Sequence, residues 1–156
     1  MDKPDSQAPV QGRSASSSAG HRGFRVKAVA GLLALLVGVF GAHRLYLGAR
    51  LWWLYPVVAL PALGWAARFE EWYREPAFFV TAAVGLIGLV EAIVFCLTPD
   101  ERWDARWNRG ASRRSSSGWP AVLIAIAALM LGATLMMSVL AIALEGYFSS
   151  HPNLPR

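Results

Sequence analysis

The longest apolar run of the chain covers residues 121–144, and none of these 24 residues is charged. As an α-helix the run would be about 36 Å long, which exceeds the ~30 Å hydrocarbon core of a bilayer. It is therefore predicted to cross a membrane at a tilt. The composition points the same way, because 55% of the residues are hydrophobic and only 16% are charged, which argues against a soluble globular domain.

Two further apolar segments have, or approach, the length of a membrane span. Residues 77–98 carry a single charge, that of Glu91, and are long enough to cross. Residues 28–42 reach a spanning length only when the segment continues to Gly48, with its polar residues near one end, where long side chains can extend to the interface. Both segments are predicted to be membrane helices.

Residues 51–67 form a fourth apolar segment, interrupted by Pro56 and Pro61. Proline removes a backbone hydrogen-bond donor, and the Trp and Tyr residues that this segment contains favour the bilayer interface. The segment either crosses as a kinked helix or dips into the membrane and returns. The sequence thus predicts an all-α polytopic membrane protein with four hydrophobic helical segments and three or four crossings.

The positions of the lysines and arginines test the number of crossings, because cytoplasmic loops carry an excess of them. With three crossings, five in the N-terminal tail and five in residues 99–118 lie on one side, against five on the other. Four crossings give eight against seven, which sets no orientation. The charges favour three crossings with the tail in the cytoplasm, whereas the helix lengths favour four.

The chain divides into a tail, a membrane module, a connecting helix and a last span. Residues 1–26 are rich in Ser, Gly, Ala and Gln without apolar periodicity, and are predicted to be a disordered basic cytoplasmic tail. The single cysteine, Cys96, excludes an intrachain disulfide. Residues 27–98 are predicted to be a membrane module with a long connection over 49–76, and residues 99–118 an interfacial helix with its linker. Residues 119–146 are predicted to be a C-terminal transmembrane helix, and residues 147–156 a short polar tail.

Small residues recur every three or four positions in two of the apolar segments, which places them on one helix face in each. Such faces let helix backbones approach closely in lipid, where van der Waals contact drives association. The two faces are therefore predicted packing surfaces, although their partners are not specified by the pattern. The first face has Gly31, Ala34, Gly38 and Gly41, and the second has Thr81, Gly85, Gly88 and Ala92.

Residues 41–48, Gly-Ala-His-Arg-Leu-Tyr-Leu-Gly, place an imidazole, a guanidinium and a phenol at the end of the first apolar segment. Such groups are not expected to face lipid. With the run that precedes it from Leu32, the string resembles the TM2 domain, a small membrane module of two helices. The resemblance is close over residues 27–48 and looser over 77–98, where such modules usually carry a Trp and an Asp and this chain has Glu91 as its only acid.

The resemblance implies an integral membrane protein with a helix-hairpin core whose two ends lie on the same side of the membrane. It assigns no general chemistry. The candidate residues of the motif and helix junction are Gly38, Gly41, His43, Arg44, Tyr46 and Gly48.

Glu91 is a candidate functional residue, because a carboxylate inside an apolar segment is costly and usually faces a partner or a watery cavity. Arg44 is the nearest candidate partner. At 1.5 Å per residue, Arg44 lies about 24 Å and Glu91 about 21 Å along their segments, so the two meet only if the segments run parallel. Parallel segments require residues 51–67 to cross, against the choice that the charges favour. Glu91 is interpreted as a structural carboxylate, with a proton relay as the alternative.

The stretch that follows Thr98 is predicted to start a short helix, with Thr98 as cap and Glu101 completing a capping box. Trp103 and Trp107 lie four residues apart and share one face of that helix. We predict an interfacial amphipathic helix whose tryptophans lie at headgroup level and whose arginines meet phosphates. A flexible basic linker over residues 110–118 follows. The arginines are Arg102, Arg106 and Arg109.

No pattern in the sequence indicates catalysis. The histidines lack metal-ligand spacing, no phosphate loop or nucleophile motif stands out, and the basic tail lacks the interleaved aromatic residues of a nucleic-acid surface. We predict a protein that is not an enzyme and that has no metal, cofactor or nucleic-acid partner. An enzyme acting on lipid would have only His43 and scattered acids to support it.

The predicted partners are the lipid bilayer, of a bacterial inner membrane, and a second copy of the chain or another membrane protein. The predicted function is that of a structural or protein-interaction module that packs through its small-residue helix faces. The alternative is a small transporter or proton-conducting protein that uses Glu91 and Arg44.

Overall fold

The computed structural model describes residues 24–151, which form helices joined by short connections and contain no strand. The all-helical prediction is confirmed. The predicted disordered tail lies largely outside the described residues, as do residues 152–156. The elements are α1 (Lys27–Val37), the 3-10 turn η1 (Gly38–Phe40), α2 (Ala42–Leu47), α3 (Leu54–Ala66), the 3-10 turn η2 (Trp72–Arg74), α4 (Pro76–Leu97), α5 (Asp100–Trp107) and α6 (Trp119–Ser150).

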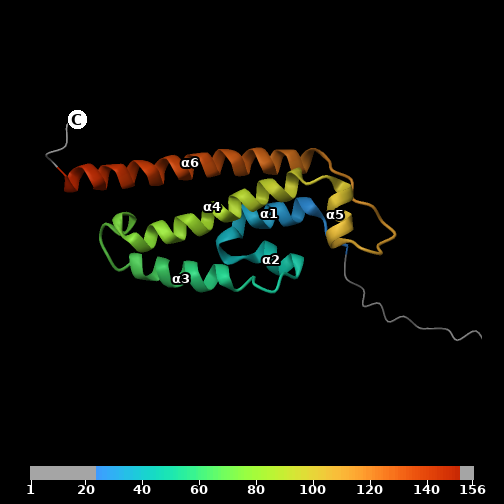
Figure 1. Ribbon diagram of the computed structural model, residues 1–156, viewed down its shortest axis with the longest axis horizontal. Coiled ribbons are helices and arrows are strands. Elements are labelled where there is room, and N and C mark those ends of the chain that lie inside the picture. Colours follow the sequence, from blue (N-terminus) through green and yellow to red (C-terminus); the bar gives the residue numbers. More distant parts are fainter. Residues whose placement is uncertain (1–23, 152–156) are drawn as a thin grey trace, which may run out of the picture.

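Helices α4 and α6 are the two described helices that are long and apolar enough to cross a membrane. Their 22 and 32 residues correspond to about 33 Å and 48 Å. The two helices pack side by side along the length of the molecule (Figure 1). Helix α6 continues to Ser150, beyond the predicted end at residue 146, so part of the predicted polar tail is helical.

The first predicted span is not one continuous helix over residues 28–48, which corrects that expectation. Helix α1 ends at Val37, and the chain reverses at Gly41, whose φ of 68° lies in the left-handed region. A Cβ at this position would lie 2.5 Å from the carbonyl oxygen of Trp52, so only glycine fits the turn. Helix α2 then runs back beside α1 and ends at Gly48, with φ 69°. The chain therefore doubles back at Gly41.

Helix α3 lies within the predicted fourth segment, residues 51–67, and has Pro61 in its interior. Its 13 residues extend only about 20 Å, which is short of the hydrocarbon core. In Figure 1, α1 lies along the half of α4 next to α5, and α3 lies along the half next to η2. The two short helices α1 and α3 therefore cover α4 one after the other along its length.

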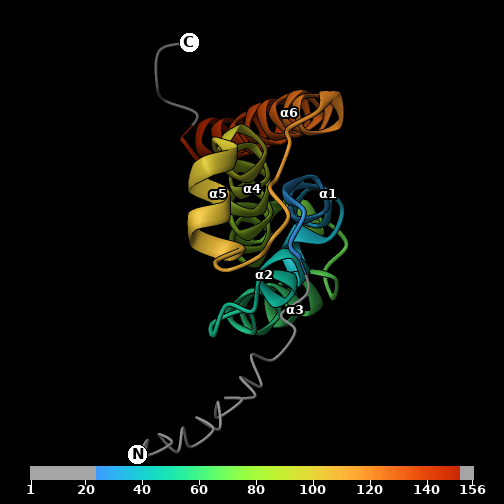
Figure 2. The ribbon, with the colours of Figure 1, turned by 90° about the vertical axis from the view of Figure 1, so that its right-hand side faces the viewer.

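The helices form three layers in the end-on view of Figure 2: α6, then α4 beside α1, then α2 and α3. The contact between α1 and α4 is made by small residues. A Cβ on Gly88 would lie 3.0 Å from the Cα of Gly38, and Ala34, Ala92 and Ala128 form a buried cluster beside them. Most of the two predicted small-residue faces therefore meet within the chain, whereas Gly41 packs against Trp52 and Tyr55 and Thr81 donates to Ala59 of α3.

Charge is distributed unequally between the two ends of the molecule. We call the end that contains α5 the basic end and the end that contains η2 the acidic end. Among the described residues, the acidic end has Arg68 and Arg74 with the carboxylates Glu70, Glu71, Glu75 and Glu145. The basic end has three carboxylates, Asp100, Glu101 and Asp104, and the larger number of bases Arg25, Lys27, Arg50, Arg102, Arg106, Arg109, Arg113 and Arg114.

Candidate functional site

A polar cluster joins α2 to α4 inside the molecule. We call His43, Arg44, Tyr55 and Glu91 the junction cluster. The Arg44 Nε donates to Glu91 Oε1 at 3.1 Å, and an Arg44 Nη2 contact to the same oxygen completes the ion pair. The Nε2 of His43 contacts the other carboxylate oxygen. Both oxygens of this carboxylate, which lies on the apolar helix α4, therefore have hydrogen-bond partners among the side chains of α2.

The reversal at Gly41 is what brings Arg44 to Glu91. Helices α1 and α4 run in opposite directions (Figure 1), and the depth calculation from a straight segment would keep the two charges apart. Because α2 doubles back, it runs in the same direction as α4 and carries Arg44 to the level of Glu91. The pair was anticipated as partners, but the condition attached to it, that residues 28–48 and 77–98 run parallel, is wrong.

His43 is completely buried, with a relative exposure of 0%. Its ring packs edge-on against Tyr55, with 5.4 Å between centroids, and lies 5.9 Å from the ring of Phe95. Its Nδ1 has no hydrogen-bond partner among the residues that the structure describes. A neutral ring that donates from Nε2 to Glu91 leaves a lone pair rather than a proton unpaired, which is the less costly choice in an apolar pocket.

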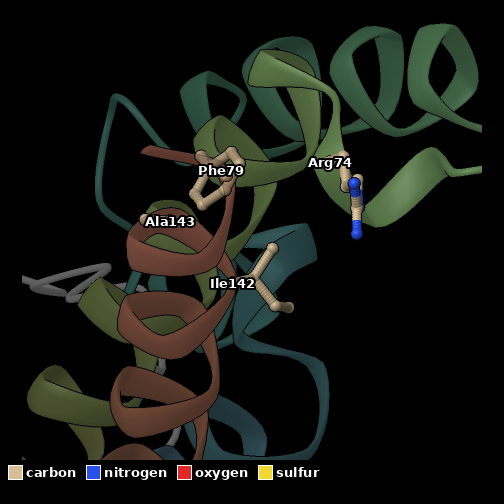
Figure 3. Close-up of a pocket in the computed structure, with 5 residues that line it drawn as sticks. Arg74, Phe79, Ile142 and Ala143 are labelled. Carbon is tan, nitrogen blue, oxygen red and sulfur yellow. The ribbon is translucent and has the colours of Figure 1, made fainter. Parts of the chain in front are cut away.

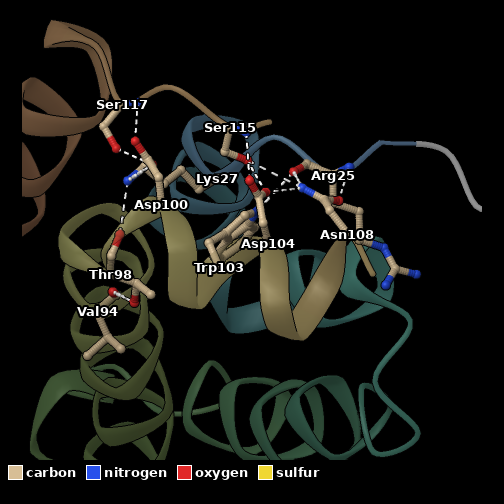
Figure 4. Close-up of polar contacts among 10 residues, drawn as sticks. All are labelled: Arg25, Lys27, Val94, Thr98, Asp100, Trp103, Asp104, Asn108, Ser115 and Ser117. Atoms are coloured by element: carbon tan, nitrogen blue, oxygen red, sulfur yellow. Dashed lines mark hydrogen bonds and ion pairs between the residues drawn. The ribbon is translucent and has the colours of Figure 1, made fainter. Parts of the chain in front are cut away.

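Helix α5 is held against the start of α1 by a second polar network (Figure 4). The indole nitrogen of Trp103 donates to the carbonyl of Arg25 at 2.9 Å, and the Asn108 amide both donates to that carbonyl and accepts from the Arg25 backbone N–H. Lys27 Nζ lies 2.6 Å from Asp100 Oδ1 and donates to the carbonyl of Thr98 at 2.9 Å. We call these six residues with Asp104 the α5 clamp.

The clamp corrects the predicted position of Trp103. Its side chain is 1% exposed and packs against Ala30 and Leu47, so it does not lie among lipid headgroups. Trp107 shares its helix face, as predicted, but is only half-buried and lies between the guanidinium groups of Arg106 and Arg25, at 5.3 Å and 5.8 Å. The amphipathic face of α5 therefore packs mainly on protein.

The linker after α5 is also attached to it. The Ser115 backbone N–H donates to Asp104 at 2.8 Å, and the Ser117 N–H donates to Asp100 at 2.7 Å. Thr98 does not cap α5, because its hydroxyl donates to the carbonyl of Val94 and the helix begins after Pro99. The predicted capping box is therefore absent, and the two aspartates order the returning chain instead.

The clamp lowers the pKa of Asp100 to about 2. Partial burial alone would raise this pKa, but the hydrogen bonds from Lys27 and Ser117 to the carboxylate outweigh it. The hydrogen bond from Ser115 is the main cause of a lowered pKa at Asp104. Both carboxylates are thus built into the clamp in their charged form.

A cavity of about 260 Å³ separates the junction cluster from α5. We call it the basic cavity. Three arginines line it, Arg44, Arg102 and Arg106, together with one acidic residue, Glu91. Apolar side chains complete it: Leu47, Val94, Phe95, Trp103 and Trp107 are among the lining residues.

A second cavity, of about 360 Å³, lies at the acidic end between α4 and α6 (Figure 3). Phe79 and Ile142 supply apolar walls, and Arg74 stands at its edge. That guanidinium is paired with Glu145 at 2.7 Å and with Glu71 at 3.5 Å. This cavity offers no unpaired polar group to a ligand among the residues that line it.

The remaining motif residues lie close to the clamp. The backbone N–H of Val26 donates to the Tyr46 hydroxyl at 3.0 Å, and a Cβ on Gly48 would lie 2.9 Å from an Arg25 guanidinium nitrogen. Sequence reasoning did not identify Tyr55, Lys27 or Asn108 as parts of these networks. The one signal available in the sequence was a lysine, Lys27, at the start of an apolar segment. Its partner Asp100 is distant in sequence.

Comparisons of this chain with protein-family models, with curated proteins and with solved structures find no match. In residues 24–151, no group of three His, Cys, Asp or Glu side chains is arranged to hold a metal ion. The lone Cys96 is buried against Ala121 and Ala125.

Proposed function

We propose that this chain is an integral membrane protein that serves as a structural or protein-interaction module. The carrying observation is its distribution of side chains. The largest fully buried side chains are Trp103 and His43, and the rest of the core is mostly alanine and glycine. Large aliphatic side chains instead cover the outside of α4 and α6, for example Val90, Met130 and Met137. Lipid is the solvent that this surface suits.

We propose three crossings rather than four. Helices α4 and α6 supply two of them, and α1 with α3 supplies the third as an interrupted span that contains the α2 excursion. Gly38, Gly41 and His43 of the interruption are buried by protein, as non-helical backbone at membrane depth requires, whereas residues 50–54 of the connection to α3 are exposed. This arrangement puts the basic end on the cytoplasmic side, because arginine and lysine are retained there.

The arrangement also supports the proposed relationship to the TM2 domain. That resemblance implies a helix hairpin with both ends on one side, and the Lys27 to Asp100 ion pair at 2.6 Å joins the two ends of residues 27–98. The motif residues do structural work in this proposal. Gly41 makes the turn, Arg44 neutralises Glu91 while His43 hydrogen-bonds to it, and Tyr46 fixes the start of α1.

The small-residue faces that define the module act within the chain, so a partner would use another surface. The outer side of α6 presents many exposed apolar residues along its length, including Leu123, Met130 and Met137. We place a second copy or another membrane protein on this side of α6.

One observation favours the alternative, a proton-conducting protein. The Nδ1 of buried His43 is unpartnered within the described chain, and Glu91 lines the basic cavity. We rank this alternative second because both Glu91 oxygens already accept hydrogen bonds from Arg44 or His43.

Membrane fractionation tests the proposed function. The full chain, expressed in bacteria, should sediment with membranes, remain there after an alkaline carbonate wash, and require detergent for extraction. Recovery as a monodisperse species without detergent would overturn the proposal. Reconstituted in liposomes with a pH dye, the same protein should not increase proton permeability. A flux that Glu91→Gln removes, while expression and extraction stay unchanged, would establish the alternative.

A further inference from the structure

The basic cavity carries an inference that rests on the proposed membrane location. We infer that it binds the phosphate-containing headgroup of one anionic phospholipid. Arg102 and Arg106 lie four residues apart on α5 and so share a face, and Arg44 reaches the same space from α2. The three arginines thus line one cavity from two elements: the clamp holds α5, and the ion pair with Glu91 holds Arg44.

The charge balance of the cavity favours an anion. Glu91 is the only carboxylate that lines it, and this group is already paired with Arg44 and contacted by His43. Across residues 24–151, no carboxylate lies within ion-pair distance of Arg102 or Arg106. Two arginines therefore face the cavity without an internal counter-ion, and guanidinium groups suit the oxygens of a phosphate.

The position and the walls of the cavity favour a lipid as the source of that phosphate. The cavity lies where α4 ends, with Thr98 in its lining, which is the level of the headgroups if α4 crosses the membrane. Leu47, Phe95 and Trp107 give it apolar sides that suit the glycerol and upper acyl region of a lipid. A soluble phosphate would leave those sides in contact with water.

Native mass spectrometry of the full chain in detergent, with phosphatidylglycerol or phosphatidylcholine added, tests this inference. The wild-type chain should retain one phosphatidylglycerol and should not retain phosphatidylcholine. The double variant Arg102→Gln/Arg106→Gln should bind phosphatidylglycerol about 30-fold more weakly, as expected for two arginines near an anionic headgroup. The matched double variant Arg109→Gln/Arg114→Gln removes the same charge from the same end, outside the cavity lining, and should lose less than about threefold.

A second variant separates the cavity from its charges. Ala49 lines the cavity, so Ala49→Trp should fill the space while every arginine remains, and should abolish lipid retention. Equal losses in the two double variants, or full retention in Ala49→Trp, would overturn the inference.

An arm with excess inorganic phosphate distinguishes the source of the anion. Phosphate should leave the bound lipid in place, and displacement of the lipid by phosphate would identify a soluble anion as the occupant and overturn the lipid assignment. Failure of lipid binding by a chain that still requires detergent for extraction overturns this inference alone. A chain that needs no detergent overturns the proposed function first.

Discussion

At the scale of single residues, the molecule depends on charges that are neutralised away from bulk water. An unpaired charge on Glu91 would be costly in the apolar helix α4, and an unpaired charge on Arg44 would be costly on α2, which lies among the same apolar helices. Each is acceptable because the other lies beside it, with His43 completing the pair. The same logic applies at the basic end, where buried Lys27 is paired with Asp100.

Glu91→Gln should destabilise the protein by about 2 kcal/mol, because it leaves the Arg44 guanidinium without its counter-ion in a partly buried site. Unfolding of the purified protein in mixed micelles, followed by circular dichroism, measures this change. The matched control is Glu101→Gln, which alters an exposed carboxylate on α5 and should change stability by less than about 0.5 kcal/mol. Equal effects in the two variants would show that the junction cluster contributes nothing to stability.

Attachment of α5 should depend on pH in the acid range. The pKa of Asp100 is lowered to about 2 in the folded protein, against about 3.9 in an unfolded chain. Its contribution is therefore complete above about pH 4 and is lost as the pH falls toward 2. The fluorescence of buried Trp103 should shift to longer wavelength over that range. The variant Asp100→Asn should lose this pH-dependent shift of Trp103 fluorescence. A shift of the same size and midpoint in that variant would show that Asp100 is not the group that titrates.

At the scale of elements, the sequence predicted the long helices well and the short ones poorly. Helices α4 and α6 have apolar runs that exceed the hydrocarbon core of a bilayer, so their existence follows from length alone. The first segment was extended to Gly48 to reach that length, and the left-handed turn at Gly41 was missed. Glycine is common in membrane helices, so its identity does not distinguish a packing position from a reversal. The contact with Trp52 and Tyr55 that requires the turn is tertiary.

The junction of α1 with α4 should not tolerate a side chain at its closest point. Gly88→Ala would bring a Cβ to 3.0 Å from the Cα of Gly38, where only backbone can yield, and should cost about 1–3 kcal/mol. Gly64→Ala is the control, since a Cβ there meets no atom within 4 Å and alanine favours the helix. Unfolding in mixed micelles compares the two variants. A Gly88→Ala protein as stable as Gly64→Ala would show that the helices are less closely packed than the structure has them.

At the scale of the whole molecule, the reversal at Gly41 makes the pairing of Arg44 with Glu91 compatible with the three crossings proposed above. Charge favoured three crossings and the pairing of Arg44 with Glu91 favoured four, because both arguments treated residues 28–48 as one straight span. Once α2 returns, Arg44 and Arg50 lie toward the basic end. The pairing and the charge asymmetry then agree with one arrangement. The identities of Glu91 and Arg44 as partners could be found from the sequence, whereas the Trp103, Asn108 and Arg25 contacts join distant positions that no local pattern connects.

The return of α2 to the side from which α1 enters is the central claim, and topology mapping tests it most directly. Single cysteines introduced after residues 26, 48, 72 and 110 of a chain with Cys96 replaced by serine would be labelled in intact cells with a membrane-impermeant reagent. We expect the positions after 26, 48 and 110 to be protected together on the cytoplasmic side, and the position after 72 to be labelled from outside. Labelling of the position after 48 from outside, with that after 26 protected, would make residues 28–48 a complete span and contradict this account.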